Sequence, residues 1–252
     1  MLNRIELLFL AATLASLSLM ITRLGAQSAP PRPSDVVQTS SGDLRITPLS
    51  HASLMMELGG KVIHVDPVSA AGDYAGLPQA DLILVTDLHP DHMDRAMIDK
   101  LKKAGTIVLA STAVQKTITE AQTIANGEKK TVAGIEIEAV PMYNLTRGPG
   151  PGQLFHDKGR GNGYILNLGG KRLYLSGDTE CIPEMKALRN IDIAFICMNL
   201  PYTMTPGEAA GCATAFKPKI VYPYHFRGSD PQEFANGVKG TPGVDVRIRK
   251  WY

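Results

Sequence analysis

The feature that most constrains the fold is a succession of short apolar segments that occurs twice along the chain. In each half, two apolar segments flank a glycine pair, at Gly59-Gly60 and Gly169-Gly170, which predicts a β-hairpin. Apolar strands then alternate with helical segments. The expected strands are 44–48, 53–58, 61–65, 81–86, 106–110, 134–140, 163–168, 171–176, 191–198 and 219–223. This order predicts two αβ halves that pack together.

Helices are expected where capping residues precede helical sequence. Asp94 caps a helix over 95–103, which Gly105 is expected to end. The segment 205–208 (TPGE) is a capping box with proline at the first helical position. Asp230 begins a third helix in the same way.

The N-terminal segment differs in composition from the rest of the chain. Residues 7–21 read LLFLAATLASLSLMI, with Arg4 before and Arg23 after the run. Small residues up to Ala26 offer a cleavage point, so residues 1–26 are predicted to be a signal peptide that directs export to the periplasm or outside the cell. An uncleaved membrane anchor is the alternative, although the run is short against the about 20 apolar residues that a spanning helix needs.

The remaining chain is expected to be a proline-rich linker, 27–41, and a globular domain, 42–252. A net charge of +2 is too balanced for a nucleic-acid-binding protein. The three cysteines cannot all pair, which argues against a disulfide scaffold. Without a C-x-x-C pair, a thiolate zinc cluster has no support. Cys197 is expected in the core, Cys212 in a helix and Cys181 packed beneath its loop.

Histidines and aspartates stand at the ends of expected strands. The segment 87–92 (DLHPDH) follows strand 81–86, and His156 opens a glycine-rich loop. Asp178 follows strand 171–176, and His225 follows strand 219–223. Imidazoles and carboxylates from several strand ends can meet at one edge of the sheets, where they could ligate metal. The candidate ligands are Asp87, His89, Asp91, His92, His156, Asp178 and His225.

This order resembles the pattern of the metallo-β-lactamase superfamily: H-x-H-x-D-H, then a His, an Asp in a turn such as G-D-T, and a late His. The segments 51–53 (HAS), 65–67 (VDP), 139–144 (AVPMYN), 177–180 (GDTE) and 223–225 (PYH) resemble ascorbate-6-phosphate lactonase-like hydrolases. N-acyl-phosphatidylethanolamine phospholipases D are similar more distantly. The resemblance implies an α/β fold, a four-layer αβ/βα sandwich of two mixed β-sheets flanked by helices.

The resemblance also implies one or two divalent metal ions at the sheet edges. One ion would be held by positions 87, 89 and 156, and the other by positions 91, 92 and 225, with Asp178 bridging. Asp87 stands where the pattern has its first histidine, so it either ligates through oxygen or serves only as a loop residue. Zinc is the expected ion, and the extra oxygen keeps manganese or iron as alternatives.

Metal ions lower the pKa of water from about 15.7 to about 7, which supplies a metal-bound hydroxide as nucleophile. Asp91 and Asp178 are the candidate catalytic residues, which would orient this hydroxide and accept a proton. We therefore expect a metal-dependent hydrolase that cleaves a lactone, ester, amide or phosphodiester bond of a small molecule. The alternatives are a lipid phosphodiesterase similar to the phospholipases D above, and a non-catalytic metal- or ligand-binding protein with a degenerate site.

Candidate substrate-binding residues lie beside His156. Lys158 and Arg160 could clamp a phosphate or carboxylate, while Tyr143 and Tyr202 are placed at the pocket mouth by the resemblance alone. The expected partner is a small molecule, with anionic and lipid compounds as options. Nucleic acid is not expected, and membrane contact is expected only with an uncleaved N-terminal segment. The sequence does not define an oligomeric state.

Two further polar residues are expected close to the site without ligating. They are His51 and Asp66. Asp66 either accepts an N–H from a ligating imidazole or is a turn residue before Pro67, and both interpretations stay open. His64 is expected to pack in the core or behind the ligands.

Overall fold

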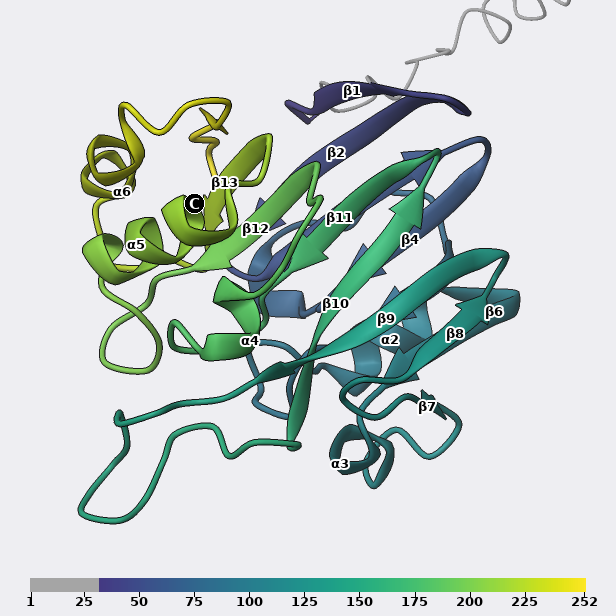
Figure 1. The fold of residues 1–252 in the computed structure, drawn as a ribbon. Coiled ribbons are helices and arrows are strands. Elements are labelled where there is room, and N and C mark those ends of the chain that lie inside the picture. The colour runs from purple at the N-terminus through teal and green to yellow at the C-terminus, as the bar shows by residue number, and fades with distance from the viewer. Residues whose placement is uncertain (1–31) are drawn as a thin grey trace, which may run out of the picture. The chain divides into compact units, whose positions relative to one another are not determined.

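The computed structural model describes residues 32–252, in which two seven-stranded sheets face each other (Figure 1). Sheet A contains, in spatial order, β1 (Asp35–Thr39), β2 (Gly42–Ser50), β3 (Ser53–Leu58), β4 (Lys61–Val65), β5 (Ala80–Leu84), β6 (Lys102–Ala110) and β7 (Gln122–Thr123). Sheet B contains, in spatial order, β14 (Asp245–Val246), β13 (Ile220–Tyr224), β12 (Ile193–Cys197), β11 (Lys171–Leu175), β10 (Gly161–Leu168), β9 (Ile135–Met142) and β8 (Lys129–Val132). The helical segments are η1 (Ser69–Ala71), α2 (Arg95–Leu101), α3 (Thr112–Gln115), α4 (Pro183–Lys186), α5 (Pro206–Phe216) and α6 (Pro231–Val238).

Both sheets are mixed and repeat one topology. The antiparallel hairpins β3–β4 and β10–β11 turn at Gly59-Gly60 and Gly169-Gly170, as predicted. Parallel strands follow each hairpin, β5 and β6 in sheet A and β12 and β13 in sheet B. The carboxyl ends of these parallel strands therefore lie at one edge of each sheet, which is where the predicted site residues follow.

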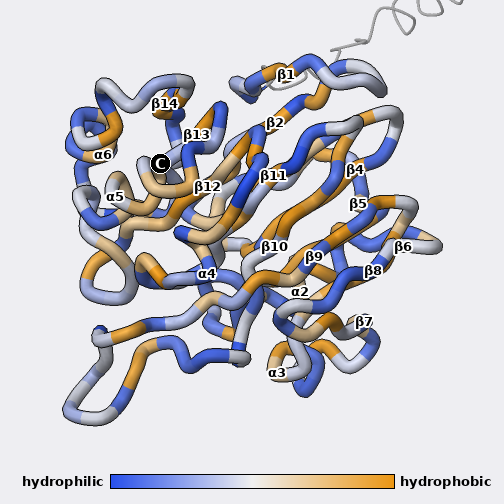
Figure 2. Tube along the Cα trace, viewed as in Figure 1, coloured by the Kyte–Doolittle hydropathy of each residue, from blue (hydrophilic) through white to orange (hydrophobic). Residues whose placement is uncertain are grey.

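Buried apolar residues form one cluster between the sheets and beneath α5 and α6, and a second cluster beneath α2. Hydrophobic residues recur along many of the strands that contribute to these clusters (Figure 2). In β5, Leu82 and Leu84 join the cluster between the sheets, whereas Ile83 joins the cluster under α2. Successive side chains of a strand point to opposite faces, so β5 is apolar on both faces after Asp81 because both of its faces are covered. Helices α5 and α6 cover the outer face of sheet B (Figure 1). The four-layer αβ/βα sandwich is thus confirmed.

The predicted linker over 27–41 is wrong for its second half. Residues 35–39 form β1, which pairs antiparallel with β2 from Asp35↔Ile46 to Thr39↔Gly42. The predicted signal peptide or anchor, 1–26, lies outside the described residues. Between residues 32 and 252, no helix combines the length and the apolar character needed to cross a membrane.

Two local expectations also need correction. Helix α2 ends at Leu101, and Gly105 lies inside β6, because the chain becomes extended at Lys102 to pair with β5. Cys181 and Cys212 form a disulfide, which the odd cysteine count did not reveal. This bond ties α5 to the loop that follows Asp178. Cys197 is free and buried in β12, as expected.

Asp35 joins β1 to the C-terminal segment, which gives a test of this part of the fold. Its carboxylate accepts hydrogen bonds from Arg249 Nε and from the Tyr222 hydroxyl, both at 2.6 Å. Burial by itself would raise the pKa of Asp35, but these donors lower the pKa below its usual value. Asp35→Asn should therefore reduce the free energy of unfolding by about 1–2 kcal/mol at pH 7, measured by urea denaturation.

The pH dependence of this difference has a defined sign. Because the pKa of Asp35 is lowered in the folded state, its stabilising contribution is present above its unfolded pKa of about 4. That contribution is lost as the pH falls through the folded pKa, so wild type and Asp35→Asn should converge in acid. The exposed neighbour Asp43 provides the control substitution, Asp43→Asn. Equal stability of Asp35→Asn and wild type at pH 7 would show that β1 is held by other contacts.

Candidate metal centre

Most of the predicted ligands, and Asp66 beside them, converge because they follow the carboxyl end of a strand, whereas His156 comes from the loop between β9 and β10. Asp66 follows β4, Asp87 lies three residues after β5, and Asp178 lies three residues after β11. His225 directly follows β13. His89 and His92 come from the turn between β5 and α2. All of these ends face the same edge, so residues far apart in the sequence share one site.

One set of potential ligand atoms, here called the His92 group, consists of His92, Asp91, Asp178 and His225. His92 Nε2 lies 3.1 Å from His225 Nε2, 3.3 Å from Asp178 Oδ2 and 3.9 Å from Asp91 Oδ2. His225 Nε2 lies 3.2 Å from Asp178 Oδ1. Four potential ligands therefore direct their donor atoms at one small volume, a pattern that suits a divalent cation.

A buried carboxylate sets the direction of the central imidazole. Asp66 Oδ2 lies 2.8 Å from His92 Nδ1, which leaves Nε2 to face the other ligands. Asp66 is in turn fixed by Thr86, whose backbone N–H donates to Oδ1 at 2.7 Å and whose hydroxyl donates to Oδ2 at 2.6 Å. Of the two interpretations of Asp66, the geometry favours contact with a ligand imidazole.

His51 lies beside the His92 group, as expected. Its Nε2 is 3.2 Å from Asp91 Oδ2, and its ring stacks on that of His225 with centroids 3.7 Å apart. Its Nδ1 lies 2.6 Å from the hydroxyl of Tyr252, a neighbour that the sequence did not indicate. His51, Asp66 and His225 all have positive φ, at 53°, 43° and 48°. Such conformations cost on the order of 1–3 kcal/mol each in non-glycine residues and cluster at functional sites.

The second set, here called the Asp87 group, consists of Asp87, His89 and His156, whose donor atoms lie within 4.8 Å of one another. His156 Nε2 lies 3.2 Å from Asp178 Oδ2, so Asp178 stands between the two groups. Arg160 also enters this set: it donates from Nε to Asp87 Oδ1 at 3.0 Å and from Nη2 to Asp87 Oδ2 at 2.6 Å. The structure thus pairs Arg160 with Asp87, whereas a substrate contact was predicted.

The charges of the site favour a cation among carboxylates. Burial alone would raise the pKa of Asp178, but His225 and His92 beside it hold that pKa well below its usual range. Burial alone would lower the pKa of His92, but Asp178 and Asp66 raise it well above its usual value. Among the described residues, His156 Nε2 and Asp178 Oδ1 are buried without a hydrogen-bond partner. Each of these atoms faces another candidate ligand at 3.2 Å, His156 Nε2 facing Asp178 Oδ2 and Asp178 Oδ1 facing His225 Nε2. A metal ion would satisfy them, because buried polar atoms are otherwise nearly always hydrogen-bonded.

The loop between β9 and β10, residues 143–160, supplies His156 and is anchored by Asn144, which the resemblance placed only at the pocket mouth, and by Glu180, which was not predicted as a site residue. Asn144 Oδ1 lies 2.7 Å from His156 Nδ1 and directs Nε2 of that ring toward the site. Buried Glu180 accepts from the backbone N–H of Arg147 at 2.6 Å and from the Asn144 amide at 3.1 Å. The sequence carried only a weak signal for these roles, since both residues fell inside the short motif matches.

The remaining predicted substrate-binding residues, Lys158, Tyr143 and Tyr202, differ in whether they are free to contact a ligand. Lys158 Nζ pairs with Glu184 at 2.6 Å and lies 4.9 Å above the ring of Tyr143, whose hydroxyl also donates to Glu184. Tyr202 is 44% exposed and packs edge-on against Phe155. Tyr202 is therefore accessible to a ligand, whereas the charge of Lys158 is already paired.

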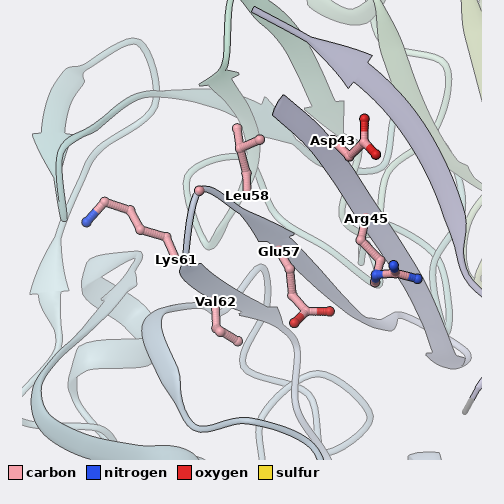
Figure 3. Close-up of a pocket in the computed structure, with 8 residues that line it drawn as sticks. Asp43, Arg45, Glu57, Leu58, Lys61 and Val62 are labelled. Atoms are coloured by element: carbon pink, nitrogen blue, oxygen red, sulfur yellow. The ribbon is translucent and has the colours of Figure 1, made fainter. Parts of the chain in front are cut away.

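The hollow shown in Figure 3 is separate from the metal-ligand cluster. It is lined by polar side chains around the β3–β4 turn, among them Asp43, Arg45 and Glu57. The turn stands at the opposite end of β4 from Asp66, and at about 3.3 Å per strand residue the two are roughly 17 Å apart. No residue of the His92 or Asp87 groups lines this hollow.

A sandwich of two mixed sheets with histidines and aspartates at its strand ends defines the metallo-β-lactamase class. The chain belongs to the beta-lactamase superfamily domain family, whose model matches residues 45–225. The more specific likeness to ascorbate-6-phosphate lactonase-like hydrolases stays a prediction.

Individual relatives agree with this family. A UPF0173 metal-dependent hydrolase of Thermococcus kodakarensis is 30% identical over 204 residues, covering 74% of this chain and 88% of that protein. The 2.30 Å crystal structure of a proposed metal-dependent hydrolase from Parabacteroides distasonis is 44% identical, with a TM-score of 0.83, over 88% of this chain and all of the other. The metallo hydrolase Igni18 of Ignicoccus hospitalis has a TM-score of 0.67 at 24% identity, over 82% of this chain and 95% of that one, which shows likeness of fold.

The Asp66–His92 contact predicts the effect of a substitution on metal affinity. Asp66→Asn keeps the shape of the side chain but removes the charge that orients the imidazole. We expect the dissociation constant for Zn²⁺ to rise about 10- to 100-fold, measured by competition with a chromophoric chelator. Asp81→Asn, at the start of β5, is the control. An unchanged affinity in a folded Asp66→Asn protein would show that His92 does not depend on Asp66 or does not ligate.

Proposed function

We propose that this protein is a metal-dependent hydrolase whose divalent ion is held by the His92 group. The observation that carries the proposal is the convergence of His92 Nε2, His225 Nε2 and both Asp178 oxygens, with His92 fixed from behind by Asp66. Zinc suits a site of imidazoles and carboxylates. The family relatives that carry the name metal-dependent hydrolase support the same activity.

When bound, such an ion supplies a nucleophile by lowering the pKa of water to about 7. Asp91 is 45% exposed and faces His225 and His51, so its carboxylate is accessible from solvent beside the candidate ligands. Burial would raise the pKa of Asp91, but hydrogen bonds from those two histidines hold the pKa well below its usual range. An ionised Asp91 can accept a hydrogen bond from water and orient it toward a substrate.

The substrate we propose is a small molecule with a hydrolysable lactone, ester, amide or phosphodiester bond and an apolar part. Leu145, Leu200 and Tyr202 are each more than 40% exposed. They belong to two loops that Asn144 joins beside His156, since its side chain donates to the Tyr202 carbonyl at 2.8 Å. Exposed apolar side chains of this kind often mark a ligand-binding surface.

We also propose that the protein is exported. The apolar run 7–21 is the sequence evidence for export. The Cys181–Cys212 disulfide is independent support, because disulfides persist in oxidising compartments such as the bacterial periplasm.

Removal of metal tests the catalytic part of the proposal. Dialysis against a chelator should abolish hydrolysis in a panel of an aryl ester, an aryl phosphodiester, a lactone and a β-lactam, and Zn²⁺ should restore it. Asp178→Asn should lower kcat/KM at least about 100-fold, because Asp178 faces both His92 and His225. Asp99→Asn, at an exposed position of α2, is the control and should behave as wild type. Full activity after chelation or in Asp178→Asn would refute hydrolysis at this centre.

Fractionation and N-terminal sequencing test export. The expected product is a chain that starts near Gln27, found outside the cytoplasm, with two of its three cysteines unreactive to a thiol reagent until reduction. Full-length protein in the membrane fraction would favour the anchor. Full-length protein in the cytoplasm with three titratable thiols after denaturation would contradict export.

A further inference from the structure

The guanidinium of Arg160 contacts the atoms of Asp87 and His89 that could otherwise ligate a metal ion. Both carboxylate oxygens of Asp87 accept from it, at 3.0 and 2.6 Å, and its Nη2 lies 3.0 and 3.1 Å from the two ring nitrogens of His89. Its Nη1 donates to the Phe155 carbonyl at 2.8 Å. Two of the three candidate ligands in this group are therefore engaged by one side chain.

The pair is built into the protein and is not a surface contact. The side chain of Asp87 is fully buried, and that of Arg160 is 19% exposed. The Arg160 backbone is held as well, because the Ser111 hydroxyl donates to its carbonyl at 2.6 Å. A bidentate arginine–carboxylate pair is planar and directional, so the guanidinium is fixed in position as well as in charge.

The charges of the two groups differ accordingly. In the Asp87 group, the negative charge of Asp87 is balanced by the positive charge of Arg160. The other two members are imidazoles, so the group carries no net charge when both imidazoles are neutral. In the His92 group, Asp91 and Asp178 supply two negative charges, which one divalent ion balances. A divalent ion in the Asp87 group would lie against a fixed positive charge that it could not displace without leaving Arg160 unpaired.

We propose that Arg160 takes the place of a second metal ion, so that this centre binds a single ion tightly, in the His92 group. The inference rests on the proposed metal centre and specifies its stoichiometry. Asp87 then serves as the partner of Arg160 rather than as a ligand, and His156 is left to face Asp178 from the Asp87 side.

Metal counting on folded protein tests the proposal without an activity assay. Apoprotein prepared with a chelator is titrated with Zn²⁺, and bound ions are counted by native mass spectrometry and calorimetry. Wild type should bind about one ion per chain tightly. Arg160→Gln removes the charge that opposes a second ion, so a second ion should bind at least about tenfold more tightly than it does to wild type. Arg95→Gln is the matched control, because Arg95 pairs only with exposed carboxylates on and near α2.

A second variant separates the two roles of Asp87. Asp87→Ala should still bind one ion with wild-type affinity, provided that circular dichroism shows a folded protein. Two ions of similar affinity in wild type would overturn the inference and leave the hydrolase proposal intact. A single ion in both wild type and Arg160→Gln would also overturn it, since Arg160 would then not be what excludes the second. No binding at all would refute the proposed function itself.

Discussion

The contact between Asp66 and His92 is the interaction on which the rest of the site depends. Asp66 sits at the end of β4 and His92 in the turn after β5, so this contact joins two neighbouring strands at the edge of sheet A. Thr86 donates two hydrogen bonds to the carboxylate of Asp66, and these bonds offset the free-energy cost of burying that carboxylate completely. Because Nδ1 of His92 is engaged in this way, Nε2 is the atom that meets Asp178 and His225 from sheet B.

Sheet B contributes the carboxylate of Asp178, which contacts both His92 and His225. Asp178 lies between His92 and His225 and also faces His156, so a single side chain contacts three imidazoles. His51 is joined to His225 through the backbone, since the His225 N–H donates to the His51 carbonyl at 3.0 Å. Both residues have positive φ, and the cost of these conformations must be met by the packing of the two sheets. The packing of the two sheets thereby holds His51 and His225 close together beside the other candidate ligands.

The loop 143–160 adds what the sheets cannot supply. Its path is fixed by hydrogen bonds to Glu180, and Glu180 stands next to Cys181, which is bonded to α5. The loop therefore depends on the segment after β11 as much as on its own sequence. It positions two side chains with different roles: the His156 imidazole faces Asp178, and the Arg160 guanidinium neutralises Asp87.

The sequence by itself determined the succession of hairpins and parallel strands, and it placed the ligand candidates at strand ends. These features follow from local pattern: apolar runs, the glycine pairs, and the aspartates and histidines that come after them. Only the tertiary structure decided three things: that Arg160 pairs with Asp87, that Cys181 pairs with Cys212, and that residues 35–39 join sheet A. The partners are 3 to 11 residues apart in the β1–β2 pairing, 31 residues apart in the disulfide and 73 residues apart in the Arg160–Asp87 pair, and pattern along the chain does not say which of these groups meet. Which groups pair is determined by burial and charge balance when the two sheets pack against each other.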